Sequence, residues 1–196
     1  MKIIVGLGNP GVEYENTRHN AGYLFVDAMI SLPDFSLAAP VAFNKESKFD
    51  AMIAETTLSG EKYIFVKPLT YMNLSGAAVA KVLNFYKASA SDLIVVSDDI
   101  DLPIGSSRVR AEGSSGGQKG LQNIIDQLGG HIFTRIRIGI QSTTEKNVNI
   151  TTSDYVLGKF GPDEKKVLKD VFDATIEYVM PFLKNNVEIA PHSISV

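Results

Sequence analysis

An imidazole and an amide lie close together in the first twenty residues, where a general base and a hydrogen-bonding group could act on one substrate. Lys2–Leu7 is a short apolar run, and the turn Gly8-Asn9-Pro10-Gly11 ends it sharply. Asn9 therefore follows a predicted strand, and His19 precedes a predicted amphipathic helix. Ligands of open α/β sheets bind at the carboxyl ends of strands, so this arrangement could bring both side chains to one crevice.

A group of acidic residues follows the β-branched run Leu93–Val96, which predicts a buried parallel strand. Asp98, Asp99 and Asp101 could bind magnesium, because hard cations take carboxylate oxygens, or they could form a solvated turn. One of them could instead orient a histidine and stabilise its imidazolium, as the aspartate of a catalytic triad does. Asp98 is the best placed for that role, because it directly follows the strand end at Ser97.

The motif Gly6-Leu7-Gly8-Asn9-Pro10-Gly11 matches the dinucleotide-binding pattern G-x-G-x-x-G after a predicted strand. Dinucleotide binding requires a helix that begins directly at the glycines, and here a polar stretch through Arg18 delays the helix. A plain tight turn is the other interpretation, and we favour it.

The motif Gly113-Ser114-Ser115-Gly116-Gly117 matches G-x-S-x-G, in which Ser115 would be the nucleophile of a serine hydrolase. Such an enzyme also needs an acid and a histidine downstream. His131 lies in a predicted loop and His192 in the C-terminal tail, and neither follows a strand as a triad histidine would. A flexible glycine loop is the simpler interpretation.

Several cations lie near the predicted loops and strand ends and could rim one crevice. They are Lys67, Arg108, Arg110, Lys119, Arg135 and Arg137. Surface lysines and arginines usually form a solvated charged face, and the formal net charge of −3 argues against nucleic-acid binding driven by bulk charge. A local basic groove on an acidic protein would nevertheless suit an anionic substrate.

The composition predicts one ordinary globular domain over residues 1–196. Hydrophobic residues make up 44% and charged residues 21%, no apolar run is long enough for a membrane span, and the amino end lacks the pattern of a signal peptide. The absence of cysteine excludes disulfides, thiolate catalysis and cysteine-based zinc sites, and it is compatible with a cytosolic setting. The three histidines are too scattered for a metal-binding motif.

Strands and helices alternate along the chain, which favours a layered α/β fold with a partly parallel sheet. The patterns predict helices at 20–30, 76–87, 121–128 and 162–184, a hairpin from 49–58 and 63–66, and further strands at 108–110 and 134–140. Pro181 is expected to kink or end the last helix, and residues 185–196 are expected to be loosely ordered.

The order and spacing of several motifs resemble those of the bacterial peptidyl-tRNA hydrolase family, far more specifically than any single motif would. The resemblance runs from residue 1 to Phe160. The motifs that carry it are Gly6-Leu7-Gly8-Asn9-Pro10-Gly11, Thr17-Arg18-His19-Asn20, Lys67-Pro68-x-Thr70-Tyr71-Met72-Asn73-x-Ser75-Gly76, Asp98-x-x-Asp101-Leu102-Pro103-x-Gly105, the glycine stretch 113–120 and Arg135-x-Arg137-x-Gly139-Ile140.

The resemblance implies a single-domain, three-layer α/β/α sandwich with a central mixed, partly parallel, twisted sheet. It implies hydrolysis of the ester that joins a peptide, or an N-blocked amino acid, to the terminal adenosine of tRNA. It also implies a cytoplasmic monomer that recycles tRNA, binds its CCA end and acceptor stem, and needs no metal, cofactor, membrane or obligate protein partner. A non-catalytic tRNA-binding or RNA-binding module is the alternative.

The resemblance also assigns roles to individual positions. His19 matches the family's catalytic base, Asp98 the carboxylate that supports it, and Asn9 a residue that helps to distinguish blocked from unblocked aminoacyl groups. Arg110 and Arg137 match basic positions that hold a phosphate of the acceptor stem. The other residues expected to contact tRNA or peptide are Tyr14, Tyr71, Met72, Asn73 and Lys119. Met72 and Tyr71 could form an apolar wall for the peptide, or they could simply pack in the core.

The glycine loop departs from the family pattern. It usually reads Gly-Gly-His-Asn-Gly, whereas here it reads Gly116-Gly117-Gln118-Lys119-Gly120. Lysine carries a charge and cannot accept a hydrogen bond as asparagine can. Lys119 could instead reach a phosphate of the CCA end.

Overall fold

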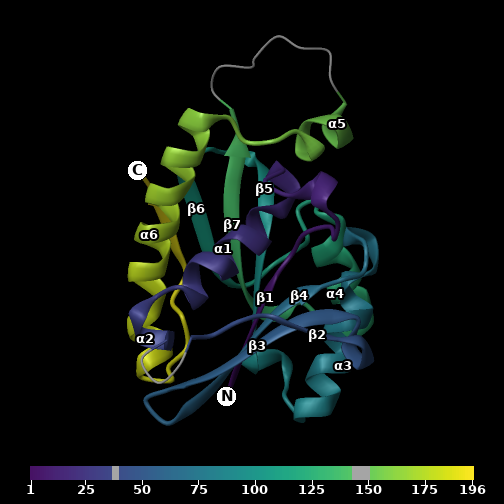
Figure 1. The fold of residues 1–196 in the computed structure, drawn as a ribbon, viewed down its shortest axis with the longest axis vertical. Helices are drawn as coiled ribbons and strands as arrows, with labels where there is room; N and C mark the ends of the chain where they lie inside the picture. The colour runs from purple at the N-terminus through teal and green to yellow at the C-terminus, as the bar shows by residue number, and fades with distance from the viewer. Residues whose placement is uncertain (37–39, 143–150) are drawn as a thin grey trace.

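The strands of the chain form one mixed sheet in the computed structural model, which describes residues 1–36, 40–142 and 151–196 (Figure 1). The strand order in the described residues is β2-β3-β4-β1-β5-β7-β6-β8. The strands are β1 (Lys2–Gly6), β2 (Asn44–Glu46), β3 (Ala51–Leu58), β4 (Glu61–Pro68), β5 (Leu93–Pro103), β6 (Ser106–Glu112), β7 (Ile132–Gln141) and β8 (His192–Ser195). The predicted α/β fold and the predicted hairpin, which is β3 and β4, are confirmed.

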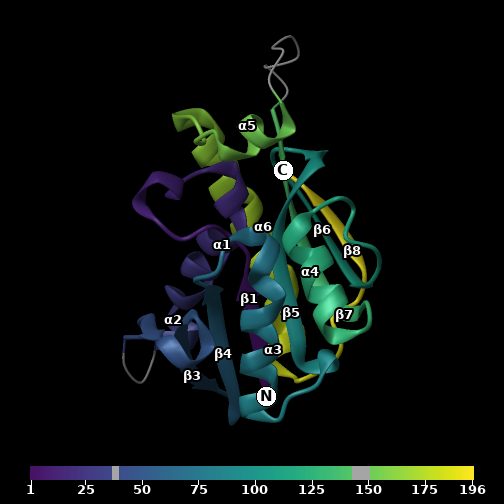
Figure 2. The ribbon, with the colours of Figure 1, turned by 90° about the vertical axis from the view of Figure 1, so that its right-hand side faces the viewer.

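Helices cover both faces of this sheet and make a three-layer arrangement (Figures 1 and 2). The α-helices are α1 (Ala21–Ile30), α2 (Pro33–Ser36), α3 (Ser75–Tyr86), α4 (Lys119–Leu128), α5 (Thr152–Leu157) and α6 (Pro162–Lys184). Short 3-10 helices are η1 (Val12–Tyr14), η2 (Arg18–Asn20), η3 (Ser47–Phe49), η4 (Met72–Leu74) and η5 (Ala90–Asp92). One hydrophobic core lies under α1, α2 and α6, and a second lies under α3 and α4.

The central strands β4, β1, β5 and β7 run parallel, so their carboxyl ends meet at one edge of the sheet. Gly6, the last residue of β1, pairs with Val96 of β5, and Val96 pairs in turn with Ile136 of β7. The turn at Asn9 and the acidic segment around Asp98 therefore emerge at the same edge, which is where open α/β sheets bind ligands.

Helix α1 packs very close to β1 because glycines lie on both sides of the contact. A Cβ atom on Gly22 would lie 2.4 Å from the backbone nitrogen of Leu7, and one on Gly6 would lie 2.3 Å from the carbonyl oxygen of Gly22. The backbone N–H of Tyr23 also donates to the carbonyl of Leu7, at 3.2 Å. This close approach places η2, which directly precedes α1, beside the ends of β1 and β5.

Strand β5 is longer than the sequence pattern predicted. It continues to Pro103, so the acidic residues lie within a strand and not in a turn after it. Its pairing with β1 ends at Val96, whereas its pairing with β7 continues through Asp99. At Asp98, β5 is therefore no longer paired with β1, and η2 lies on the side of β5 that β1 has left.

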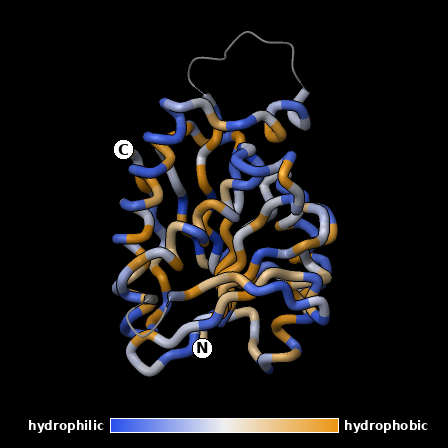
Figure 3. The backbone as a smooth tube through the Cα atoms, in the orientation of Figure 1, coloured by the Kyte–Doolittle hydropathy of each residue, from blue (hydrophilic) through white to orange (hydrophobic). Residues whose placement is uncertain are grey.

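The C-terminal segment confirms the predicted helix and corrects the prediction for the tail. Helix α6 spans the predicted range and does not end at Pro181, because a proline in the last turn removes few hydrogen bonds. The tail beyond the helix is not loose, since β8 pairs antiparallel with β6 and Ile189 is only 3% exposed. Figure 3 shows hydrophobic and hydrophilic residues alternating around α6, as expected of a helix with one buried side. Among the helices of the described residues, none combines the length and hydrophobicity that crossing a membrane requires.

Candidate active site

The imidazole of His19 and the carboxylate of Asp98 form the centre of the candidate site. Nδ1 of His19, on η2, lies 2.8 Å from Oδ2 of Asp98, on β5. The two side chains are 15% and 4% exposed. A carboxylate at Nδ1 holds the ring in the tautomer that carries its proton there, which leaves Nε2 free to accept another proton.

A cavity of about 410 Å³ opens beside this pair. Its walls come from η2, β5, the glycine loop, the start of α4, β7 and α5, which are far apart in the sequence. Its lining includes His19, Asp98, Gln118, Lys119, Arg137 and Val156. The cavity thus places two cations and three aspartate carboxylates beside a candidate base.

Arg137, on β7, contacts a buried carboxylate and the glycine loop at once. Its Nε lies 3.0 Å from Oδ2 of Asp99, whose side chain is 2% exposed. Gly116, at φ +56°, packs so closely on the guanidinium that a Cβ atom there would lie 2.0 Å from Nη2. A guanidinium fixed in this way at a cavity wall is well suited to bind a phosphate.

The two neighbouring arginines have different surroundings. Arg135 is 1% exposed, and its guanidinium donates to the carbonyl of His131 at 2.7 Å. Burial lowers the pKa of Arg135, and the charge of Arg137 lowers it further. Arg110 donates to the carbonyl of His192 on β8, at 3.0 Å, and is not among the residues that line the cavity. Of these three arginines, only Arg137 lies at the cavity.

Asn9 ties the turn after β1 to η4. Its Oδ1 accepts from the backbone N–H of Met72 at 2.8 Å, and its own backbone N–H donates to Oδ1 of Asn20 at 2.8 Å. The side-chain NH₂ of Asn9 is therefore the group left to meet a substrate. Asn9 lines a second hollow, of about 460 Å³, which it shares with Lys67 and not with His19. Lys67 is ion-paired there with Asp27 and does not rim the first cavity.

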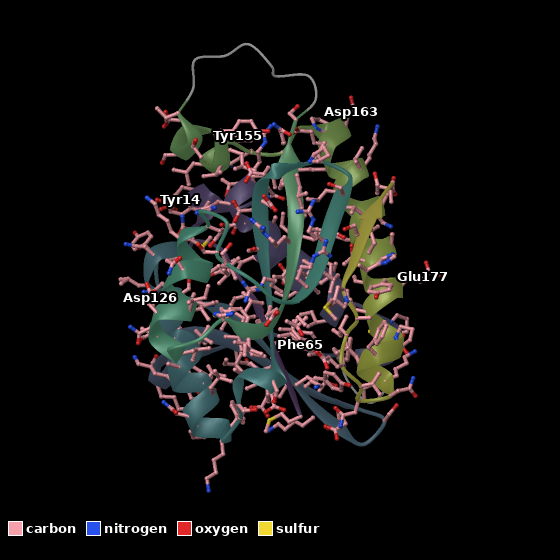
Figure 4. All side chains as sticks on the ribbon, turned by 180° about the vertical axis from the view of Figure 1, so that it is seen from behind. Tyr14, Phe65, Asp126, Tyr155, Asp163 and Glu177 are labelled. Carbon is pink, nitrogen blue, oxygen red and sulfur yellow. The ribbon has the colours of Figure 1, made fainter. Side chains whose placement is uncertain are left out.

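The residues expected to line the site for tRNA and peptide differ in exposure. Tyr14 and Tyr71 pack edge to face, with ring centroids 6.4 Å apart, and Tyr71 is 57% exposed. Asn73 is exposed on η4, whereas Met72 is 4% exposed and packs in the core. The tyrosines and Asn73 could contact a ligand directly, while Met72 could do so only as a buried wall. Figure 4 shows Tyr14 at the end of the molecule that also carries Tyr155 of α5.

Arg18, next to His19 in the chain, holds α5 and the start of α6 against η2. Its guanidinium makes two hydrogen bonds to the carboxylate of Glu164, at 3.0 and 3.1 Å, and lies 4.6 Å from the ring centroid of Tyr155. The backbone N–H of Arg18 donates to the carbonyl of Gly158 at 2.9 Å. Because α5 forms one wall of the cavity, these contacts fix that wall relative to His19.

Gln118 is a residue of the site that we did not predict from the sequence. Its Nε2 lies 3.0 Å from Oδ1 of Asp98, the carboxylate oxygen that does not face His19. The sequence signal that could have found it is its place in the glycine loop, directly before helix α4, where N-cap residues occur.

Comparison with known proteins shows the family of this chain. A sequence model of the peptidyl-tRNA hydrolase family matches residues 3–195. The chain belongs to the peptidyl-tRNA hydrolase family.

Relatives in this family align with nearly the whole chain. A peptidyl-tRNA hydrolase of Chlorobium phaeovibrioides is 43% identical over 190 residues, covering 97% of this chain and 95% of the relative. One of Brevibacillus brevis is 46% identical over 170 residues, covering 87% and 85%. The crystal structure of peptidyl-tRNA hydrolase from Acinetobacter baumannii aligns with a TM-score of 0.82 at 31% identity, covering 95% of this chain and 89% of that one.

Membership of the peptidyl-tRNA hydrolase family leaves little support for the other motif interpretations. The hydroxyl of Ser115 donates to Oε1 of Gln122 at 2.8 Å, so its hydrogen bond goes to an amide and not to a histidine. No α-helix begins at the glycines of residues 6–11, because α1 starts only at Ala21. In the acidic cluster, Asp98 and Asp99 are engaged by other side chains, and the described part of the chain has no group of three or more His, Cys, Asp or Glu that could hold a metal ion.

Proposed function

We propose that this chain hydrolyses the ester between a peptide and the terminal adenosine of tRNA, with His19 as the general base. Membership of the peptidyl-tRNA hydrolase family supports the reaction. The observation that supports the role of His19 is its 2.8 Å contact with Asp98 at the wall of a cavity that also carries two cations.

The reaction needs only a water molecule and the His19–Asp98 pair. Nε2 of His19 takes a proton from the water as its oxygen attacks the ester carbonyl. Asp98 holds the ring and stabilises the imidazolium that forms. The bond between the carbonyl carbon and the ribose oxygen then breaks, and the imidazolium returns the proton to that oxygen. Such general-base catalysis contributes about 100- to 10,000-fold to the rate.

Selection of a blocked amino group is proposed for the amides of Asn9 and Asn73. Both residues carry donors and acceptors, which can bind the first peptide amide of the substrate. A free aminoacyl-tRNA presents an ammonium at that point in place of an amide, so the same contacts would reject it. A donor of either residue could also face the developing oxyanion.

The cations are proposed to bind the tRNA. Lys119 would meet a phosphate of the CCA end, because it lines the cavity beside His19. Arg137, at the wall of the same cavity, and Arg110, whose guanidinium contacts β8, would hold a phosphate of the acceptor stem. We propose that the protein works as a monomer in the cytoplasm, where translation supplies this substrate, and that it uses no metal or cofactor.

The proposal is tested by incubating the protein with N-acetyl-aminoacyl-tRNA and, separately, with the same tRNA carrying an unblocked amino acid, with and without a chelator. We expect rapid release of the N-acetyl amino acid, little release of the unblocked one, and no effect of the chelator. A protein that binds tRNA but releases no blocked amino acid would be a binding module. An activity lost with chelator would contradict the metal-independent mechanism.

A further inference from the structure

We propose that Gln118 is a positioning residue for the His19–Asp98 pair, an inference that rests on the proposed function. Gln118 precedes α4 as its N-cap and is 8% exposed. Buried amides are retained where their hydrogen bonds are satisfied. The hydrogen-bond partners of the Gln118 side chain therefore indicate its role.

The side chain of Gln118 connects three parts of the site. Its Oε1 accepts from the backbone N–H of Leu121 at 2.8 Å, which caps α4. Its Nε2 lies 3.0 Å from Oδ1 of Asp98 and 3.1 Å from the sulfur of Met72. These partners determine the orientation of the amide, because the N–H of Leu121 needs an acceptor and a carboxylate needs a donor.

Each oxygen of Asp98 therefore has its own partner. Oδ2 faces His19 and Oδ1 faces Gln118. Two partners fix the plane of the carboxylate, so that it cannot rotate away from Nδ1 of His19. Without the amide of Gln118, Oδ1 would lose its donor in a nearly buried setting, which is costly for an ionised group.

The choice of a glutamine has a second consequence. An amide does not titrate, so Gln118 donates to Asp98 equally at every pH at which the protein is folded. A titratable residue here would make the geometry of the pair depend on pH. Gln118 thus makes the orientation of Asp98 independent of pH, while His19 gains and loses a proton during the reaction.

The experiment compares Gln118→Glu with Gln118→Met. The glutamate keeps the length and the oxygen that caps α4, and its carboxyl group can donate to Asp98 only while protonated. We expect the ratio of Q118E to wild-type kcat to fall as pH rises from about 6 to 8.5, because two adjacent carboxylates repel once both are ionised. Q118M has no such proton, and we expect its kcat to be about 10- to 100-fold lower at every pH, the range for a hydrogen bond to a charged group.

A purely structural role for Gln118 makes different predictions. Loss of the helix cap alone would lower Tm, most in Q118M, but would leave the kcat of the folded variants and its pH dependence unchanged. The KM for N-acetyl-aminoacyl-tRNA should stay within about threefold of wild type, since Gln118 acts through Asp98 and not on the substrate.

The matched control is Gln122→Glu, one turn further along α4. Gln122 is exposed and bonds to Ser115 and Asp126, so Q122E adds the same charge near the loop without touching Asp98. We expect wild-type kcat at every pH. A wild-type kcat in folded Q118E and Q118M would overturn only the inference about Gln118. Failure of the unmutated protein to hydrolyse the substrate would instead overturn the proposed function.

Discussion

His19, Asp98 and Gln118 form a chain of side chains in which each hydrogen bond determines the next. The amide orients the carboxylate, and the carboxylate holds Nδ1 of the imidazole. The motifs at residues 17–20 and 98–105 led to the first two residues from the sequence. Gln118 was not predicted. Its place before α4 could have marked it as an N-cap, but that local pattern does not include its contact with Asp98, 20 positions earlier in the chain.

Arg137 provides a test of phosphate binding at the scale of one residue. Arg137→Gln removes a guanidinium at the cavity wall, and we expect KM for N-acetyl-aminoacyl-tRNA to rise about tenfold. The slope of log KM against log salt concentration should become shallower by about one, because one phosphate contact is lost. Steady-state kinetics at several salt concentrations measures both.

Lys169→Gln is the control for this measurement, since Lys169 is a cation on the solvent side of α6, with its side chain 74% exposed. It should leave KM and the salt slope unchanged. If Arg137→Gln behaves like this control, the guanidinium does not meet tRNA.

At the scale of elements, local patterns predicted the segments with strong hydrophobic periodicity and missed those whose structure depends on distant pairing. The hairpin β3–β4 and helix α4, with Gly129 just after its end, were predicted. Strand β5 was predicted too short, because its second half is acidic and reads as a turn. Strand β8 was missed because His192–Ser195 has no strand pattern of its own, and only its pairing with β6 makes it a strand.

The contact between α1 and β1 makes a prediction about stability. Gly22→Ala would place a Cβ atom 2.4 Å from the carbonyl oxygen of Val96 and from the nitrogen of Leu7. Both are backbone atoms that cannot move aside cheaply, and overpacking costs about 1–3 kcal/mol. We expect a free energy of unfolding lower by about 2 kcal/mol in urea denaturation, although alanine favours helix.

The control for this substitution is Gly130→Ala, because a Cβ atom on Gly130 would meet nothing within 4 Å. We expect this variant to stay within about 0.5 kcal/mol of wild type, as surface substitutions usually do. Equal stability of the two variants would show that α1 does not pack on β1 as closely as described.

At the scale of the molecule, the site is assembled from segments that only the parallel centre of the sheet brings together. Asn9 follows the end of β1, and Asp98 lies just beyond the point where β5 stops pairing with β1. Arg18 holds α6 at this edge through Glu164 and α5 through the ring of Tyr155. The alternating pattern of the sequence predicted this edge of the sheet but not the shape of its surface. Two hollows lie at the edge, one lined by His19 and the other by Asn9. Their shapes depend on turns and side-chain contacts that hydrophobic periodicity does not encode.

The central claim is that His19 activates the attacking water, and single-turnover hydrolysis of N-acetyl-aminoacyl-tRNA by His19→Ala tests it most directly. His131→Ala is the matched control, since His131 is exposed and lies outside the His19 cavity. We predict that His19→Ala hydrolyses the substrate about 100- to 10,000-fold more slowly than wild type while binding tRNA with unchanged affinity, and that His131→Ala behaves as wild type. A wild-type single-turnover rate in folded His19→Ala would contradict the account.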